Sequence, residues 1–453
     1  MPHMLIKGGC VVTMDTRLGE LAVGDVLIED DRIAAIGPAL AAPPGVETID
    51  AAGMIVMPGL VNAHLHTWQS ALRGIAGDWT VAHYMQAMHR GLATLFRPED
   101  IYIANLMGAL NQINGGATTL VDWCHNNPTP DHTDAAIKGL SDAGIRAVFL
   151  HGSPKPNPKP GQKHFSEMPM PRAEVERLRK GRFAVDGLMT LGLAILGPYY
   201  SIWDVTRADV ALANELNLIC SMHVGGGVPM VADGFERLAS EGLIGKNFNV
   251  VHGNDIKPDV IRAIVERGGG FTVTAEIELQ MGYGDPLTGA LLALGSPVSI
   301  GTDVEPAARG DMFTAMRVTL QHERNRAIME MVQKTGQRPE QMPVTCRDAL
   351  GWTTVNGARM AGLDHRTGSL TPGKAADIVL LRADDITMFP VRDPIASIVM
   401  QAGVANVDTV LVAGQVMKRG GKLLHPGLPE LKAALRRSGD RILADFGYRA
   451  SAA

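Results

Sequence analysis

Short apolar runs that alternate with segments of helical composition dominate the middle of the chain. Segments 208–217 and 259–269 are examples of the helical composition between the runs. Near-continuous apolar strands with intervening helices are typical of a parallel sheet, and eight of them predict a closed (β/α)8 barrel. The predicted strands lie in the runs 56–64, 116–123, 144–152, 187–197, 217–226, 247–255, 269–276 and 296–303.

The two ends of the chain have a different pattern. Both contain short β-branched runs separated by glycine and aspartate turns, which is typical of strands. Neither end is long enough to bury a core alone, so we expect them to form one small β-sandwich together. The predicted fold is therefore α/β, with a TIM-like barrel over 58–366 and a β-sandwich from 1–57 and 367–453. The second piece also includes a terminal helix.

Composition and charge exclude several classes of protein. Of the 453 residues, 46% are hydrophobic and 20% are charged, which is near the globular average and excludes extensive disorder. Lys and Arg number 42 against 47 Asp and Glu, so no basic surplus exists to neutralise phosphates and we expect no nucleic-acid partner. The longest uncharged stretch, 187–203, is interrupted by glycine and proline, so we expect no membrane partner.

The cysteines and the N-terminal sequence predict a location. The N-terminal sequence has no charged segment followed by an apolar run, so it does not have the pattern of a secretory signal. The four cysteines lie far apart and form no CxxC pair, which disfavours a disulfide scaffold and a thiolate zinc site. We therefore expect a cytoplasmic protein.

Histidines and one aspartate stand at the ends of several predicted strands. His64 and His66 end the first, and residues i and i+2 of a strand face the same way. His223, His252 and Asp303 each follow a later apolar run. The carboxyl ends of parallel barrel strands converge on one face, so these side chains should meet there. Three histidines and an aspartate form a plausible mononuclear metal site.

These residues and their surroundings resemble the amidohydrolase superfamily. The closest resemblance is to its cytosine, guanine and S-adenosylhomocysteine deaminase and triazine chlorohydrolase branch. It covers essentially the whole chain. It is carried by PGLVNAHLHTWQSALRG at 58–74, the strand ends at His223 and His252, GTD at 301–303 and TPGKAADIVLL at 371–381.

The resemblance implies a role for each of these residues. His64, His66, His223 and Asp303 would hold one divalent metal, most simply Zn²⁺ with Fe²⁺ as the alternative. His252 would face the substrate and the attacking water. The fourth run, GLMTLGLAILG, contains no lysine, so the carbamylated lysine that bridges two metals in other branches is not expected.

One position departs from the deaminase pattern. In the deaminases the fifth-strand histidine opens a His-x-x-Glu motif, whose glutamate moves the proton from water to the leaving group, but Gly226 stands there. Glu276 and Glu278, which we place on one face of the seventh strand, are candidate replacements, as is Asp303. Alternatively, the two glutamates form salt bridges or lie on the surface. Gly226 and its flanking glycines predict an open pocket wall or, more simply, a tight turn.

Other residues are candidates to contact the substrate. Trp68 and Gln69 directly follow the histidine pair, and His125 and His151 end the second and third strands. Core packing is the alternative for Trp68, and a solvated surface position is the alternative for the two histidines. The proline-rich segment 154–171 is expected to form a lid. Aromatic residues that could stack on a planar substrate are Trp79, Tyr84, Tyr199, Tyr200 and Trp203.

The leading hypothesis is a mononuclear metal-dependent hydrolase that acts on a C–N bond of a small cyclic or planar nitrogen compound. Deamination is the first expectation, and hydrolysis of an amide or halide is the nearest alternative because the glutamate is missing. A metal-dependent lyase or decarboxylase is a second class. A binding protein that has kept its metal is a third. The resemblance implies a homodimer or larger homo-oligomer.

Overall fold

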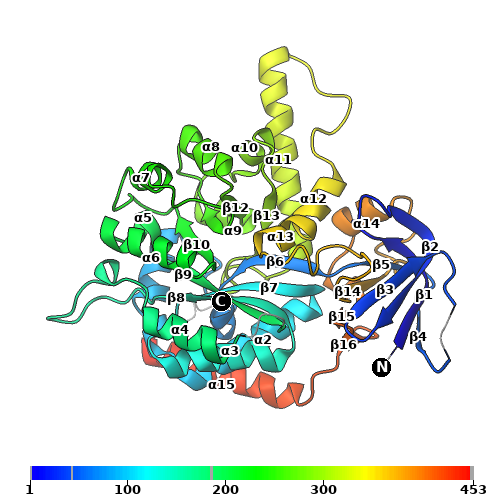
Figure 1. Ribbon diagram of the computed structural model, residues 1–453, viewed down its shortest axis with the longest axis horizontal. Coiled ribbons are helices and arrows are strands. Elements are labelled where there is room, and N and C mark those ends of the chain that lie inside the picture. Colours follow the sequence, from blue (N-terminus) through cyan, green and yellow to red (C-terminus); the bar gives the residue numbers. More distant parts are fainter. Residues whose placement is uncertain (1–2, 42–43, 184–186, 449–453) are drawn as a thin grey trace.

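The computed structural model describes residues 3–41, 44–183 and 187–448. The first two and last five residues of the predicted sandwich pieces lie outside these ranges. Figure 1 shows a barrel with a β-sheet beside it, and one long helix, α11, that projects from the barrel.

The barrel consists of eight parallel strands in sequence order. An isolated parallel bridge between Leu65 and Asp303 closes the ring from the last strand to the first. Strand β7 is buried at every position, as expected for a strand with helices outside and a packed barrel interior. The predicted barrel is confirmed. Its strands are β6 (Leu60–Leu65), β7 (Ala117–Cys124), β8 (Arg146–Gly152), β9 (Met189–Ile195), β10 (Ile219–Val224), β11 (Phe248–His252), β12 (Gly270–Val273) and β13 (Val298–Ile300).

Amphipathic helices cover the barrel. In α8, for example, Val260, Ile261 and Ile264 are buried on one face, so this helix packs its apolar side against the strands. The main helices are α2 (Pro98–Asn114), α3 (Pro130–Ala143), α4 (Arg172–Gly181), α6 (Trp203–Glu215), α7 (Gly234–Ser240), α8 (Pro258–Glu266), α10 (Thr288–Ala293), α11 (Met312–Thr335), α12 (Cys346–Trp352), α13 (Val355–Met360), α14 (Pro394–Met400) and α15 (Leu428–Phe446).

Short helical turns occupy several of the loops between strands and helices. They are η1 (Thr67–Leu72), α1 (Val81–Tyr84), η2 (Met85–His89), η3 (Leu92–Leu95), η4 (Phe165–Glu167), α5 (Gly197–Tyr200), α9 (Ala275–Met281) and η5 (Val404–Asn406). Among the described residues, no helix is long and apolar enough to cross a membrane.

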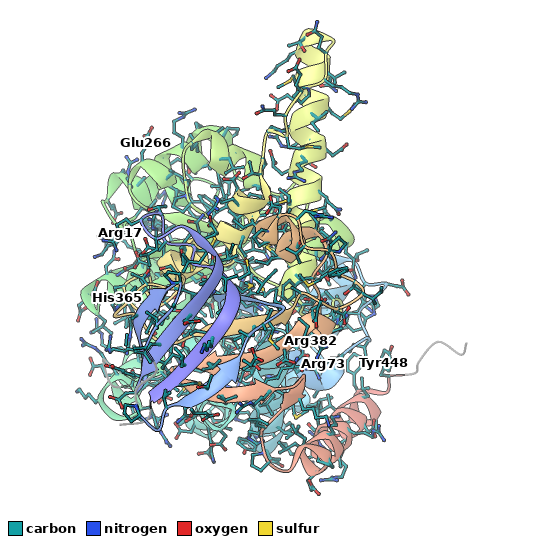
Figure 2. All side chains as sticks on the ribbon, turned by 90° about the vertical axis from the view of Figure 1, so that its right-hand side faces the viewer. Arg17, Arg73, Glu266, His365, Arg382 and Tyr448 are labelled. Atoms are coloured by element: carbon teal, nitrogen blue, oxygen red, sulfur yellow. The ribbon has the colours of Figure 1, made fainter. Side chains whose placement is uncertain are left out.

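Both ends of the chain contribute to one nine-stranded sheet, which Figure 2 shows facing the viewer. The two pieces meet where β14 pairs antiparallel with β5, with Ile378 opposite Pro58. One face of the sheet carries its own apolar cluster, separate from the barrel core. The strands are β1 (His3–Val12), β2 (Glu20–Glu29), β3 (Arg32–Gly37), β4 (Glu47–Asp50), β5 (Met54–Pro58), β14 (Ile378–Arg382), β15 (Val407–Val412), β16 (Gln415–Arg419) and β17 (Lys422–Leu423).

A buried ion pair joins this sheet to the barrel. Arg146, at the start of β8, donates from Nε to Asp377 at 2.7 Å and from a terminal nitrogen at 3.1 Å. Both side chains are almost fully buried. Because the loss of one partner would leave the other charge buried and unpaired, the C-terminal piece is tied to the barrel.

The C-terminal helix α15 packs on the barrel and not on the sheet with which the sequence analysis grouped it. It contacts α2, where Ser438 donates to Asp100 at 2.7 Å and Arg441 forms an ion pair with the same carboxylate. In Figure 1 this helix runs beneath α2 and α3.

Candidate metal centre

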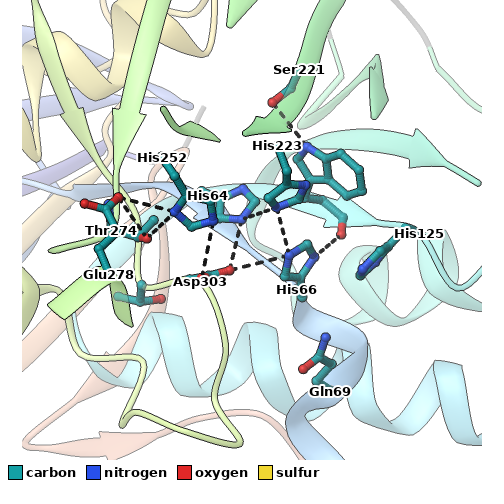
Figure 3. A network of polar contacts seen from close by, with 12 residues as sticks. His64, His66, Gln69, His125, Ser221, His223, His252, Thr274, Glu278 and Asp303 are labelled. Atoms are coloured by element: carbon teal, nitrogen blue, oxygen red, sulfur yellow. Dashed lines mark hydrogen bonds and ion pairs between the residues drawn. The ribbon is translucent and has the colours of Figure 1, made fainter. Parts of the chain in front are cut away.

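Four side chains from three strand ends converge at the mouth of the barrel. His64, His66, His223 and Asp303 each offer a ligand atom, and these atoms all lie within 4.8 Å of one another. The Nε2 atom of His223 lies 3.2 Å from Nε2 of both His64 and His66. Asp303 Oδ1 lies 3.2 Å from Nε2 of His64 and 3.5 Å from Nε2 of His66. Figure 3 shows these atoms pointing toward a common centre.

The backbone holds Asp303 against the first strand. Asp303 accepts a hydrogen bond from the His66 amide at 2.8 Å, and its own amide donates to His64 O at 3.0 Å. Asp303 has φ 61° and His252 has φ 65°, a left-handed conformation that residues other than glycine rarely adopt. Such backbone strain persists where the surrounding structure enforces it, and here it occurs at two residues of one site.

A hydrogen bond fixes the orientation of His66. Its Nδ1 donates to the carbonyl oxygen of Trp123 at 2.7 Å, which leaves the Nε2 lone pair directed at the cluster. The carbonyl thereby selects the tautomer that can bind a metal.

Burial keeps the histidines of the cluster neutral. It is the main cause that lowers the pKa of His64 and His223, and it lowers the pKa of His66 to about 3, with the charge of His64 contributing. Burial alone would raise the pKa of Asp303, but the hydrogen bond to His64 and the charge of His252 outweigh it and lower that pKa. The cluster therefore presents three lone pairs and one carboxylate at neutral pH.

This donor set fits one divalent metal ion. Two imidazole nitrogens that face each other at 3.2 Å cannot both carry a hydrogen, and their lone pairs repel unless a cation lies between them. Tetrahedral zinc with Zn–N bonds of 2.0–2.1 Å separates neighbouring nitrogens by about 3.3 Å. A His₃Asp set suits Zn²⁺, and Fe²⁺ is also compatible.

His252 lies beside the cluster without belonging to it. Its Nε2 is 3.8 Å from Asp303 Oδ2, and its Nδ1 is 3.3 Å from Glu278 Oε1 and 3.0 Å from Thr274 Oγ1. Burial would lower the pKa of His252, but the hydrogen bond to Glu278 and the charge of Asp303 outweigh it, and the pKa is raised. The Glu278 carboxylate places the ring hydrogen of His252 on Nδ1, so the Nε2 atom faces Asp303 and the cavity.

The two glutamates lie differently from the prediction. Strand β12 ends at Val273, and both glutamates belong to helix α9, where residues two apart do not share a face. Glu278 is fully buried behind His252 and accepts a hydrogen bond from the Thr274 amide at 2.8 Å. Glu276 does not line the cavity, and burial followed by the charge of Asp311 raises its pKa to about 6.

The prediction of an open glycine wall is also wrong. A Cβ atom on Gly226 would lie 2.8 Å from Val81, and one on Gly225 would lie 2.7 Å from the ring of Tyr283. Both glycines have positive φ angles. Tyr200 donates its hydroxyl to the Gly225 carbonyl at 2.7 Å. Aromatic and aliphatic side chains therefore fill the space that the glycines leave.

A cavity opens beside the cluster. Histidines and tyrosines dominate its wall, and Asp303 is the one acidic residue among the described residues that line it. The lining residues are His66, Tyr84, Met85, His89, His125, Lys155, Tyr200, His223, His252, Met281, Tyr283, Asp303 and Val304.

Of the four predicted substrate contacts, the structure brings His125 to the cavity. It stacks on His66 with ring centres 4.3 Å apart. Trp68 and Gln69 are fully buried one layer behind, where Trp68 donates to His125 at 3.1 Å and Gln69 donates to the Tyr84 hydroxyl at 2.6 Å. His151 lies away from the cavity, where Asn127 donates to its Nδ1 at 3.3 Å.

Three polar residues of the cavity wall were not predicted. His89 contacts His125, with the Nε2 atoms 3.3 Å apart, and Tyr283 lies on His252 with ring centres 4.6 Å apart. Lys155, from the predicted lid segment, extends into the same space. None of the three follows an apolar strand, so the strand-end signal that located the histidine cluster does not mark them. The Pro-Lys-Pro sequence around Lys155 is the one local sign that its backbone is restrained.

Comparisons with known proteins agree with this geometry. Residues 55–417 match the amidohydrolase family. The 5-methylthioadenosine/S-adenosylhomocysteine deaminase of Symbiobacterium thermophilum is 26% identical over 98% of this chain and 100% of its own length. The 5'-deoxyadenosine deaminase of Methanothermobacter thermautotrophicus is 27% identical over 89% of this chain and 91% of its own length.

Solved structures share the fold. A zinc-bound adenosine deaminase from Xanthomonas campestris superposes with a TM-score of 0.82 at 23% identity, covering 97% of this chain and 98% of its own. The zinc complex of atrazine chlorohydrolase from Arthrobacter aurescens superposes with a TM-score of 0.84 at 23% identity, covering 96% of this chain and 100% of its own.

Proposed function

Because the chain belongs to the amidohydrolase family, we propose that it is a mononuclear metal-dependent aminohydrolase that removes an amino group from a planar nitrogen heterocycle. The observation that carries this proposal is His252. Its Nε2 lies 3.8 Å from Asp303 Oδ2, next to a complete His₃Asp ligand set and at the wall of the cavity.

His64, His66, His223 and Asp303 would hold the metal. A divalent metal there supplies Lewis-acid chemistry, which makes water a better nucleophile at neutral pH. All four side chains are at least nine-tenths buried, so the ligands are held in position before a metal arrives.

The protein's own residues would handle the proton. Hydrolytic deamination consumes one water and releases ammonia, so a proton must move from the water to the leaving nitrogen. Asp303 Oδ2 and His252 Nε2 are the two titratable atoms positioned for this transfer. Glu278 would keep His252 oriented through Nδ1 and stabilise the imidazolium form when Nε2 takes up a proton.

The names of the relatives support an amine leaving group. The two relatives from Symbiobacterium thermophilum and Methanothermobacter thermautotrophicus, which match most of the chain, are named as deaminases of adenosine derivatives. Gly226 favours one second candidate, hydrolysis that releases a halide, because a halide ion leaves without needing the proton that the missing glutamate would deliver.

The test is release of ammonia by the zinc-loaded protein from a panel of aminopurines, aminopyrimidines and aminotriazines. We expect turnover of at least one class, and we expect its loss together with the bound zinc in His223→Ala. Chloride release from chlorotriazines without ammonia release would favour the second candidate. Turnover that persists in the metal-free protein would refute both.

Location and assembly are further proposals. All four cysteines are free, which suits a reducing cytoplasm. We propose a cytoplasmic homo-oligomer that acts on a small molecule, and measurement of the solution mass tests the assembly.

A further inference from the structure

Lys155 is a buried cation that the proposed mechanism does not use. It lines the cavity with 5% of its surface exposed, whereas Lys159 and Lys163 of the same proline-rich segment are exposed. It stands between Pro154 and Pro156, whose rings fix their own φ angles and restrict the lysine between them. The backbone is therefore restrained at the one lysine of this segment that turns inward.

The ammonium group contacts aromatic rings and no carboxylate. Nζ lies 4.4 Å from the centre of the Tyr200 ring and 5.8 Å from the centre of the Trp123 ring. Within the described part of the chain, Lys155 forms no ion pair. Burial lowers its pKa to about 8, so the group is still mostly protonated at neutral pH. The charge of Lys155 acts on the cavity, because it lowers the pKa of His89, second in size only to the effect of burial.

The charges around the cavity leave a surplus of positive charge. Asp303 is the one acidic residue among the described lining residues, and it would already neutralise half of a bound divalent metal. The metal-binding histidines, His89 and His125 are neutral, and Glu278 pairs with His252 from behind, so Lys155 adds a second net positive charge. A buried ammonium without a counter-ion is costly, and cation–π contacts offset part of that cost.

We propose that Lys155 is the counter-ion for a carboxylate of the substrate, so that the substrate is an anionic, amino-bearing planar heterocycle. This inference rests on the proposed function and assigns the substrate class of the same site. The carboxylate would lie against Nζ beside Tyr200 while the amino-bearing carbon faces His252.

The surroundings of Lys155 favour a carboxylate over a phosphate. A phosphate dianion is usually held by several donors, such as an Arg fork or successive backbone amides. No arginine lines the cavity among the described residues, and Lys155 is the one long-chain cation there. A single ammonium on aromatic faces suits a monoanion.

Binding of a matched pair of probes tests the proposal. The ligands 6-aminonicotinate and 6-aminonicotinamide differ in a carboxylate and a neutral amide of nearly the same shape. Calorimetric titration of the zinc-loaded protein should show that the carboxylate binds about tenfold or more tightly. In Lys155→Met this preference should fall to about twofold or less, and Lys155→Arg should retain most of it. Lys159→Met, in the same segment but exposed, is the matched control and should behave as the wild type.

Two results would overturn the proposal: no preference in the wild type, or an unchanged preference in Lys155→Met, which would place the carboxylate on the metal. If circular dichroism shows that Lys155→Met is unfolded, Lys155→Gln takes its place. Inorganic phosphate should displace 6-aminonicotinate no better than acetate does, and stronger displacement would overturn the choice of carboxylate.

The outcome is separable from that of the proposed function. Ammonia release from neutral heterocycles without any carboxylate preference would refute the role of Lys155 and leave the aminohydrolase intact. A Lys155-dependent carboxylate preference without release of ammonia would support the role of Lys155 and refute the aminohydrolase.

Discussion

Replacement of Glu278 by glutamine tests whether His252 depends on a carboxylate. The substitution preserves shape and removes one negative charge behind the ring. Glu278 Oε1 accepts from the Thr274 amide at 2.8 Å and lies 3.3 Å from His252 Nδ1. Oε2 accepts from Asn254 Nδ2 at 3.3 Å. A glutamine can keep its oxygen toward Thr274, so its NH₂ group would then face another NH₂ group at Asn254.

The size of the effect follows from these contacts. Asn254 cannot simply turn its amide over, because Nδ2 also donates to the Asp285 carbonyl at 2.9 Å. The variant therefore loses a charge-assisted hydrogen bond to His252 and gains a repulsive contact. Hydrogen bonds to charged groups contribute about 1.5–3 kcal/mol, which corresponds to a roughly 10–100-fold lower kcat/KM if the imidazolium forms during turnover.

Metal content and turnover should separate in this variant. Glu278 is outside the ligand set, so zinc measured by elemental analysis should stay near one per chain while turnover falls. Glu276→Gln is the matched control, since Glu276 lies on the same helix but not at the cavity. Near-normal turnover in Glu278→Gln, or an equal loss in Glu276→Gln, would refute the positioning role.

Three further predictions concern metal binding and stability. His66→Ala should lose bound zinc in elemental analysis, because its Nε2 belongs to the cluster, and full zinc occupancy would contradict this assignment. Gly226→Ala should lower the free energy of unfolding by about 1–2 kcal/mol, because the φ angle of Gly226 is 76°. Gly227→Ala, where a Cβ atom would meet open space, should change the free energy of unfolding little, and urea denaturation of the two variants measures the difference. Burial raises the pKa of Asp209 from 3.8 to about 7, so its ionisation costs stability as pH rises from about 4 to 7. Asp209→Asn should therefore stabilise the protein, with a gain about 2 kcal/mol larger at pH 8 than at pH 5.5, and a gain independent of pH would contradict the assigned pKa.

The fold could be predicted because burial leaves a strong signal in the sequence. Parallel barrel strands are buried on both faces, so each appears in the sequence as an apolar run, even where the predicted ends of the strand differ from the observed ones. The same rule located His64, His223 and Asp303, since polar residues directly after such runs lie at the barrel mouth.

The error at the seventh strand has a local cause. The run 269–276 is apolar and β-branched up to Thr274, but the following residues, AEIELQM, favour a helix. The backbone turns at Thr274 and α9 begins at Ala275. A shift from strand to helix changes which side chains share a face, so Glu278 moves behind His252 while Glu276 moves away from it.

Cavity residues on loops could not be predicted, because their direction depends on packing between distant segments. The inward turn of Lys155 depends on the rings of Tyr200 and Trp123, which come from other parts of the chain. Lys155 and Lys159 each stand between two prolines, and nothing in the sequence alone distinguishes the buried one.

The departure from the deaminase pattern extends beyond one missing glutamate. The absence of a Cβ at Gly225 allows Tyr283 to approach, and Tyr283 lies on the ring of His252. The carbonyl of the same glycine accepts the hydroxyl of Tyr200, whose ring carries the ammonium of Lys155. The glycines thus lie between the histidine that would move the proton and the cation that would bind the substrate. Glycine in place of the glutamate removes one acid–base group at position 226, where the missing Cβ makes room for Val81. The adjacent Gly225 admits Tyr283 and accepts from Tyr200, so the same turn bears on both proton transfer and the charge of the site.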